Sequence, residues 1–214
     1  MSEKVKLPVE YAYSEVLFAE VGDLNLIIGL IILIIAVAII EIRDFRIVTV
    51  LLGILGAFFI IGAFLEGTFM EIIPLAIYAI VLVPIAIFIT TVHTKQSEEP
   101  PLMHPVFSIG LLFVFGIITY VISFNVLGVG GIEWVLIMIG VFGLLTKTDL
   151  RKSVASLSIL ICSIHLLIPG FDIMIEAMLM FFSSILILVL LVFAQRVFVL
   201  KGTMSTKDLK DLRY

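Results

Sequence analysis

The sequence contains few charges and one cysteine. Charged residues make up 14% of the 214 residues, whereas about 25% is usual for soluble domains. Apolar residues make up 62%, and a soluble domain of this size would leave roughly 30% of its chain surface in contact with water. The composition therefore excludes a soluble enzyme, a disordered protein and a nucleic-acid-binding protein, and it predicts a polytopic membrane protein.

The single cysteine, Cys162, excludes an intrachain disulfide and a metal or iron–sulfur site built from cysteines alone. The sequence offers no set of His and Cys residues at metal-ligand spacing that would complete a site with His165, so no metal site is predicted. The 17 acidic residues outnumber the 13 basic ones, which argues against a phosphate-rich partner. Residues 1–23 are acidic and lack the basic start of a secretion signal. We interpret them as an extracytoplasmic segment.

Apolar runs of near-spanning length recur along the chain. A helix needs about 20 apolar residues to cross a bilayer, and continuous runs favour helices over alternating strands. The runs cover 24–40, 47–65, 72–92, 106–127, 132–145, 154–168 and 173–200. The fold predicted is an all-α transmembrane bundle with seven spans. The fifth and sixth runs are short, so oblique helices, a locally thinned bilayer or a re-entrant hairpin remain alternatives there.

The loop charges predict the orientation, because Lys and Arg are retained on the cytoplasmic side. With seven spans, Lys4 and Lys6 share one side and the remaining basic residues lie on the other. This places the N-terminus outside and the C-terminus in the cytoplasm of a cell-membrane protein.

The two halves match when the sequence is shifted by 105 residues. Asp44-Phe45-Arg46 then aligns with Asp149-Leu150-Arg151, and Glu71 aligns with Glu176. An even number of spans separates the halves, which predicts two parallel three-helix repeats. The repeats cover 24–92 and 128–200. A linker with the fourth helix (93–127) joins them, and a cytoplasmic tail (201–214) follows.

Ionisable groups inside a bilayer are candidate functional residues. Glu71 and Glu176 lie near the outer ends of the third and seventh helices, and His165 lies near the outer end of the sixth. The two glutamates are either members of a proton relay or hydrated carboxylates at the membrane interface. His165 is either a relay member or a packing residue. The middle turns of all seven predicted helices contain no Asp, Glu, Lys, Arg or His, which argues against a proton or sodium channel formed by this chain alone.

Small residues predict close helix packing. They are Gly53 and Gly56 in the second helix, and Ser156, Ser158 and Ser163 in the sixth. These faces meet either in the core of the protein or at a neighbouring subunit. Two prolines, Pro74 and Pro84, predict a kink in the third helix.

Several segments resemble a known family. They are 163–166 (SIHL), 175–176 (IE), 194–198 (AQRVF) and, in the first half, 81–84 (VLVP). With their spacing, they resemble the E component of energy-converting membrane-bound nickel–iron hydrogenases, the archaeal methanogen form being the nearest. Each half also resembles the three-helix K-type subunit of respiratory complex I.

The resemblance implies a non-catalytic membrane subunit of a complex that couples ferredoxin and hydrogen chemistry to a proton or sodium gradient. The nickel–iron centre and iron–sulfur clusters would lie in partner subunits, and this chain would hold no cofactor. The partners would be other membrane-arm and hydrogenase subunits and the lipid bilayer. Ser158, Phe182 and Ile77 stand where the K-type subunit carries glutamates, so a scaffold role is implied. A subunit of a cation/proton antiporter and a stand-alone secondary transporter are the alternatives.

Overall fold

The computed structural model describes residues 27–65, 69–92, 102–123, 131–167 and 173–202. All regular structure in these ranges is helical, as predicted. The first helix is Ile27–Glu41. The helices that follow are α2 (Phe45–Leu65), α3 (Phe69–Ala76), α4 (Val83–Val92), α5 (Pro105–Ile122), α6 (Gly131–Thr146), α7 (Leu150–Leu167) and α8 (Ile173–Lys201), with a π-helical segment η1 (Ile77–Leu82) joining α3 to α4. The predictions for residues 1–23 and for most of the tail lie outside the described residues.

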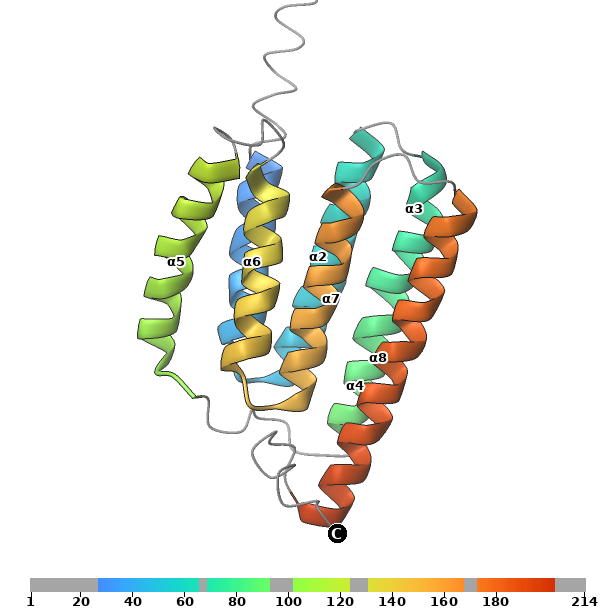
Figure 1. Ribbon diagram of the computed structural model, residues 1–214. Helices are drawn as coiled ribbons and strands as arrows, with labels where there is room; N and C mark the ends of the chain where they lie inside the picture. The colour runs from blue at the N-terminus through green and yellow to red at the C-terminus, as the bar shows by residue number, and fades with distance from the viewer. Residues whose placement is uncertain (1–26, 66–68, 93–101, 124–130, 168–172, 203–214) are drawn as a thin grey trace, which may run out of the picture.

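Helices α3, η1 and α4 run on as one long helix, so the described chain forms a bundle of seven helical segments (Figure 1). Four described segments are long and apolar enough to cross a membrane: Phe45–Gly62, Ile73–Val92, Pro105–Ile122 and Ala177–Lys201. The first helix and α6 are apolar but shorter. Helices α6 and α7, where a re-entrant hairpin was the alternative, lie alongside the other helices of the bundle (Figure 1).

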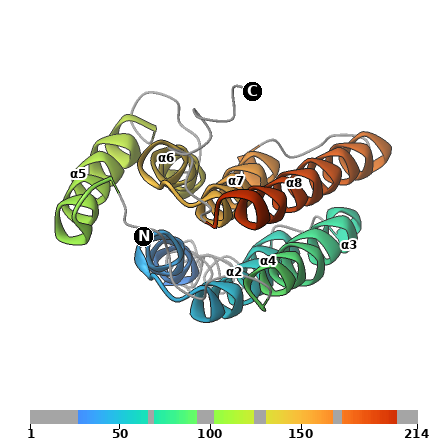
Figure 2. The ribbon, with the colours of Figure 1, turned by 90° about the horizontal axis from the view of Figure 1, so that it is seen from below.

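The helices form two rows, seen end-on in Figure 2. The first row contains the first helix, α2 and α3–η1–α4. The second row contains α5, α6, α7 and α8. The first helix faces α6, α2 faces α7, and α3–η1–α4 faces α8. The apolar core lies between the rows.

Two aspartates start equivalent helices. Asp44 Oδ1 accepts a hydrogen bond from the backbone N–H of Arg46 at 2.8 Å, and Asp149 Oδ1 accepts one from that of Arg151 at 2.9 Å. A side-chain oxygen just before a helix satisfies a free N–H of its first turn in this way. The first helix ends at Glu41 and α6 at Thr146, and α2 begins at Phe45 and α7 at Leu150. Both pairs of boundaries are 105 residues apart.

The third helical segment is irregular where prolines predict a kink. Proline has no N–H, so Pro84 cannot complete the usual bond to the carbonyl of Ile80. The neighbouring N–H of Val83 instead bonds to the carbonyl of Tyr78, five residues back. This π-helical turn lies against α2, where a Cβ added to Gly56 would be 2.9 Å from the backbone carbonyl carbon of Ala79.

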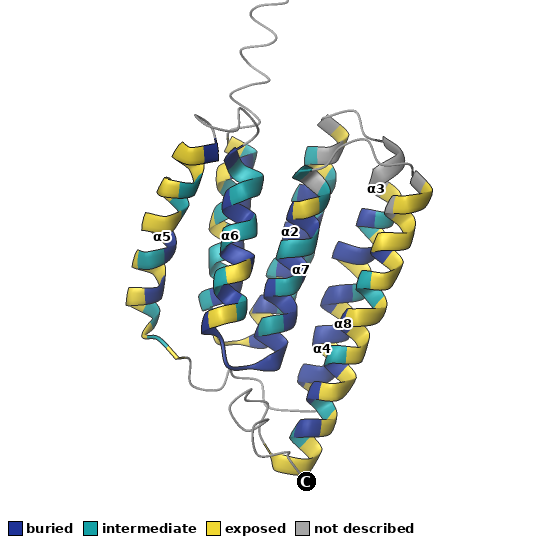
Figure 3. Cartoon of the chain, in the orientation of Figure 1, coloured by how far each residue is buried: buried dark blue, intermediate teal, exposed yellow. Residues whose placement is uncertain are grey.

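The outward faces of the bundle are apolar. Buried residues line the space between the rows, whereas α5 and α8 are mostly exposed (Figure 3). Phe113 of α5 is 70% exposed and Phe181 of α8 is 63% exposed. Exposed phenylalanine side chains suit a lipid environment, where they are not in contact with water.

Candidate functional site

Charged side chains are buried at one end of the bundle. Glu41 ends the first helix, Lys147 follows α6, and Ser108 lies in the first turn of α5. The Lys147 ammonium is 3.1 Å from Glu41 Oε2, and these side chains are only 2% and 7% exposed. The Ser108 hydroxyl donates a hydrogen bond to Glu41 Oε1 at 2.5 Å. Glu41 therefore joins three helices from both rows.

Lys152 ties the second row to the end of the first helix. Its side chain is fully buried, and its ammonium donates to the carbonyls of Ile39, Ile40 and Ile42. The last carbonyls of a helix have no partner within the helix, and a cation there also interacts favourably with the helix dipole. Lys152 thus serves as a C-terminal cap supplied from the other half of the chain.

The turn between α6 and α7 carries a second ion pair. Arg151 Nη2 lies 2.8 Å from Asp149 Oδ2, and Arg151 Nε donates to Asp149 Oδ1 at 3.1 Å. Both side chains are at most 1% exposed. The guanidinium carbon of Arg151 lies 3.8 Å above the Phe45 ring centroid, a cation–π contact from the second row to the first residue of α2.

We call Glu41, Lys147, Asp149, Arg151 and Lys152 the charge cluster. Every one of these groups has an opposite charge or a set of carbonyls as its partner. Separating such buried partners leaves an uncompensated charge, which costs about 3–5 kcal/mol. The arrangement is therefore suited to holding the two rows together.

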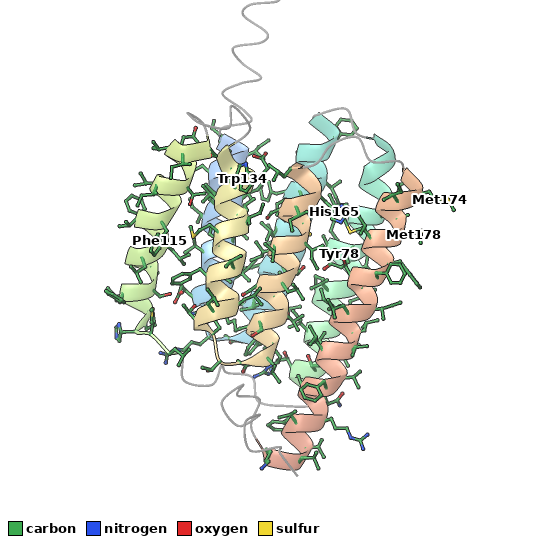
Figure 4. All side chains as sticks on the ribbon, viewed as in Figure 1. Tyr78, Phe115, Trp134, His165, Met174 and Met178 are labelled. Atoms are coloured by element: carbon green, nitrogen blue, oxygen red, sulfur yellow. The ribbon has the colours of Figure 1, made fainter. Side chains whose placement is uncertain are left out.

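A neutral polar cluster lies farther along the bundle. Tyr78 of η1 is 1% exposed, and its hydroxyl lies beside Ser158 and Cys162 of α7. That hydroxyl makes no hydrogen bond of standard geometry within the described part of the chain. His165 follows Ser158 and Cys162 on the same face of α7, since residues four and seven positions apart share a helix face. Tyr78 and His165 both project into the region between α7 and the third segment (Figure 4).

The predicted relay residues are not brought together in what is described. Glu71 lies in α3 and Glu176 in α8, but their side chains lie outside the described part of the structure. His165 is half-buried near the end of α7.

The predicted packing residues differ in their surroundings. Gly56 lies against Ala79, whereas a Cβ at Gly53 would meet nothing within 4 Å. Ser156 is buried against Gly143 of α6 and donates to its own helix at the Lys152 carbonyl, 2.8 Å away. Ser163 likewise donates to the Ile159 carbonyl at 2.6 Å. Ser156 therefore faces α6, whereas Ser158 lies beside Tyr78 of η1.

A groove lies between the first helix, α5 and α6. Its volume is about 770 Å³, and apolar side chains such as Leu33, Leu112 and Val135 line it together with Tyr120. Binding sites for small molecules usually combine an apolar lining with a few convergent polar groups. Tyr120 is the one side chain of this lining with a polar group, so the groove offers little to orient a polar substrate.

Sequence reasoning used the basic residues of the charge cluster as a guide to orientation, and it used Asp149 and Arg151 as markers of the repeat. The clearest signal for its burial is in the repeat. Lys152 stands where the first half has the apolar Ile47, and Lys147 stands where it has Ile42. A charge at a position that is apolar in the matching half indicates a specific partner.

We compared the chain with known proteins. No family model, curated protein or solved structure matches it.

Proposed function

We propose that this chain is a non-catalytic integral membrane subunit that acts as a scaffold in the membrane arm of an energy-converting hydrogenase. The complex would couple ferredoxin and hydrogen chemistry to a proton or sodium gradient, with its nickel–iron centre and iron–sulfur clusters in partner subunits. The resemblance of segments 163–166, 194–198 and 81–84 to the E component of such enzymes supports this assignment.

The observation that carries the scaffold role is the distribution of charge. The five residues of the charge cluster lie at one end of the bundle and are held in ion pairs or by carbonyls. Glu133, in the first turn of α6 at the other end, is half-buried, and one of its carboxylate oxygens is buried without a hydrogen-bond partner among the described residues. The two side chains of α7 that lie beside the Tyr78 hydroxyl, Ser158 and Cys162, carry neutral hydroxyl and thiol groups. His165, the titratable residue on the same face of α7, lies near the end of that helix. Proton or ion paths through a bilayer depend on titratable side chains, so this arrangement favours support over conduction.

The proposal includes seven spans in two parallel three-helix repeats, linked by α5. The helix boundaries at Glu41 and Thr146, and at Phe45 and Leu150, support the repeat because both pairs follow the 105-residue shift. The N-terminus would lie outside, and the charge cluster and C-terminus would lie at the cytoplasmic side.

Native mass measurement of the gently extracted membrane assembly tests the proposal. We expect the chain to be recovered with several other membrane and peripheral subunits, including a hydrogenase large subunit. Recovery with antiporter-type subunits and no redox subunit would support the antiporter alternative. Recovery of the chain alone would contradict membership of any complex.

One observation favours a stand-alone transporter as the second candidate. Secondary transporters bind substrates at irregular or interrupted helices near the bilayer midplane, and the π-helical turn at Tyr78 makes its helix irregular opposite Ser158 and Cys162. Solute uptake by liposomes that contain only this chain, lost in Tyr78→Ala, would establish that alternative.

A further inference from the structure

The two rows contact each other through faces that are not equivalent in the two repeats. Figure 2 shows the first helix, α2 and α3–η1–α4 opposite α6, α7 and α8 in the same order. A twofold axis along the membrane normal would reverse the order of one row. The second repeat is therefore displaced from the first without such a reversal, and their contact is of the heterologous type. The first repeat therefore contacts the second through its inner face only. The face of the first repeat that is equivalent to the contact face of the second repeat points outward and has no partner within the described chain.

Exposure of matching residues in the first and second rows agrees with this on the outer side of the first row. Val50 is 62% exposed, whereas its match Ala155 is 0% exposed. The same contrast holds for Ile54 with Ile159, Ile89 with Ala194, and Val92 with Val197. The residues that the second row buries against the first thus have exposed apolar counterparts in the first row.

The reverse comparison gives the same result. Ile40 and Ile87 are fully buried in the first row, whereas their matches Leu145 and Val192 are 73% and 64% exposed. Val83 and Leu188 differ in the same way. The difference in exposure therefore depends on which face of each repeat is in contact with the other repeat. It does not arise because one repeat is more exposed than the other along its whole length.

Gly53 lies at the centre of the unused face of the first row. Its match is Ser158, which is 4% exposed and lies beside the bulky Tyr78 of the other row. A Cβ added at Gly53 would have no neighbouring atom within 4 Å, and the nearby residues Val50 and Ile54 are exposed. The place that Tyr78 fills beside Ser158 is thus empty beside Gly53.

We infer that the outer face of the first row, centred on Gly53, binds a row of transmembrane helices from another subunit of the same complex. That subunit presents an apolar helix face with a bulky side chain opposite Gly53, as Tyr78 is presented to Ser158. A small residue at the centre permits such close helix packing. The inference rests on the repeat and on the membership of a complex proposed above.

A second copy of this chain is a poorer occupant for two reasons. The lysines that hold the two rows together, Lys147 and Lys152, are matched in the first row by the uncharged Ile42 and Ile47. A second copy would therefore lack the ion pair and the carbonyl cap. Heterologous self-stacking of this kind also does not close and would produce open filaments.

The test compares two tryptophan variants in the native assembly. Gly53→Trp fills the centre of the proposed contact. Gly110→Trp is the matched control, because Gly110 is exposed on α5 and also has nothing within 4 Å. We expect Gly53→Trp to lower the recovery of one membrane subunit with this chain at least tenfold, and Gly110→Trp to leave it unchanged. The amount of each variant in the membrane shows whether it folds.

A photo-crosslinking residue at position 50 gives a second readout that does not depend on a disruptive change. We expect an adduct with a single different membrane subunit, and no protein adduct from the same residue at position 110. Adducts with lipid only, or with a second copy of this chain, would overturn the inference, as would an unchanged assembly in Gly53→Trp. If the wild-type chain is recovered without any partner subunit, the proposed function is contradicted. If it is recovered with partners but Gly53→Trp does not disturb them, only the inferred contact face is contradicted.

Discussion

Lys147 and Glu41 form a buried ion pair, 3.1 Å apart, between the end of α6 and the end of the first helix. These residues are 106 positions apart in the chain, and Ser108 of α5 donates to the same carboxylate. One acidic side chain therefore connects both repeats and the helix between them.

The ion pair should show strong coupling between its partners. We expect Lys147→Met alone and Glu41→Gln alone each to destabilise the extracted protein by about 3 kcal/mol or more, because each leaves a buried partner unsatisfied. The double variant should lose much less than the sum of the two. Thermal unfolding in detergent measures this, with Lys201→Met, at an exposed position at the end of α8, as the control. Additive losses would contradict the pairing.

Lys152 should protect the end of the first helix. In Lys152→Met the carbonyls of Ile39, Ile40 and Ile42 lose their ammonium partner. We expect faster hydrogen exchange at the amides of residues 39–42, and little change in α8. An equal increase throughout the protein would indicate general unfolding instead of the loss of a cap.

The two glycines of α2 should respond differently in the isolated chain. Gly56→Leu places its side chain against the backbone of Ala79, and overpacking of this kind costs about 1–3 kcal/mol. Gly53→Leu has open space beside it and should unfold at nearly the wild-type temperature. The matched pair of melting curves is the measurement, and equal losses would show that α2 packs in a different rotation.

The hydroxyl of Tyr78 should matter little for stability, while its ring should matter much. Removing a buried group that makes no good hydrogen bond is nearly neutral or stabilising, so we expect Tyr78→Phe to melt close to the wild type. Tyr78→Ala creates a cavity between η1 and α7 and should cost about 3–5 kcal/mol. A large loss in Tyr78→Phe would show that Ser158 or Cys162 depends on the hydroxyl.

Glu71 lies near the first residue of α3 and Glu176 near the first residue of α8. We interpret them as interfacial carboxylates and not as members of a proton relay. We therefore expect Glu71→Gln and Glu176→Gln, each alone, to leave hydrogen chemistry coupled to an ion gradient largely intact in the assembled complex. Activity would be measured at equal assembly. A tenfold loss in either variant would identify that residue as part of a proton path.

The existence and approximate limits of the helices could be predicted, because long apolar runs broken by short polar turns leave few alternatives. The ends of the first helix and α6 were marked by the Asp-x-Arg turns. The pairing of Lys147 with Glu41 could not be predicted, because it depends on which helix ends meet across the bundle. Pro84 indicated an irregularity in the third segment, but a proline alone does not distinguish a kink from a π-helical turn.

The packing faces were only partly predictable for a related reason. Gly53 and Gly56 look alike in sequence, yet Gly56 lies against Ala79 and Gly53 is open. Their difference follows from the rotation of α2 between the two rows. Composition cannot fix that rotation in a helix whose residues are apolar on every side.

Proton flux through liposomes that contain only this chain tests the central claim most directly. The claim is that a protein whose charge cluster lies at one end, and whose described helices carry no Asp, Glu, Lys, Arg or His in their middle turns, supports partner subunits and does not itself conduct. With an imposed potential, we predict a rate of internal pH change equal to that of empty liposomes. A faster change that scales with the amount of protein and disappears in Tyr78→Ala or in a His165 variant would contradict the account.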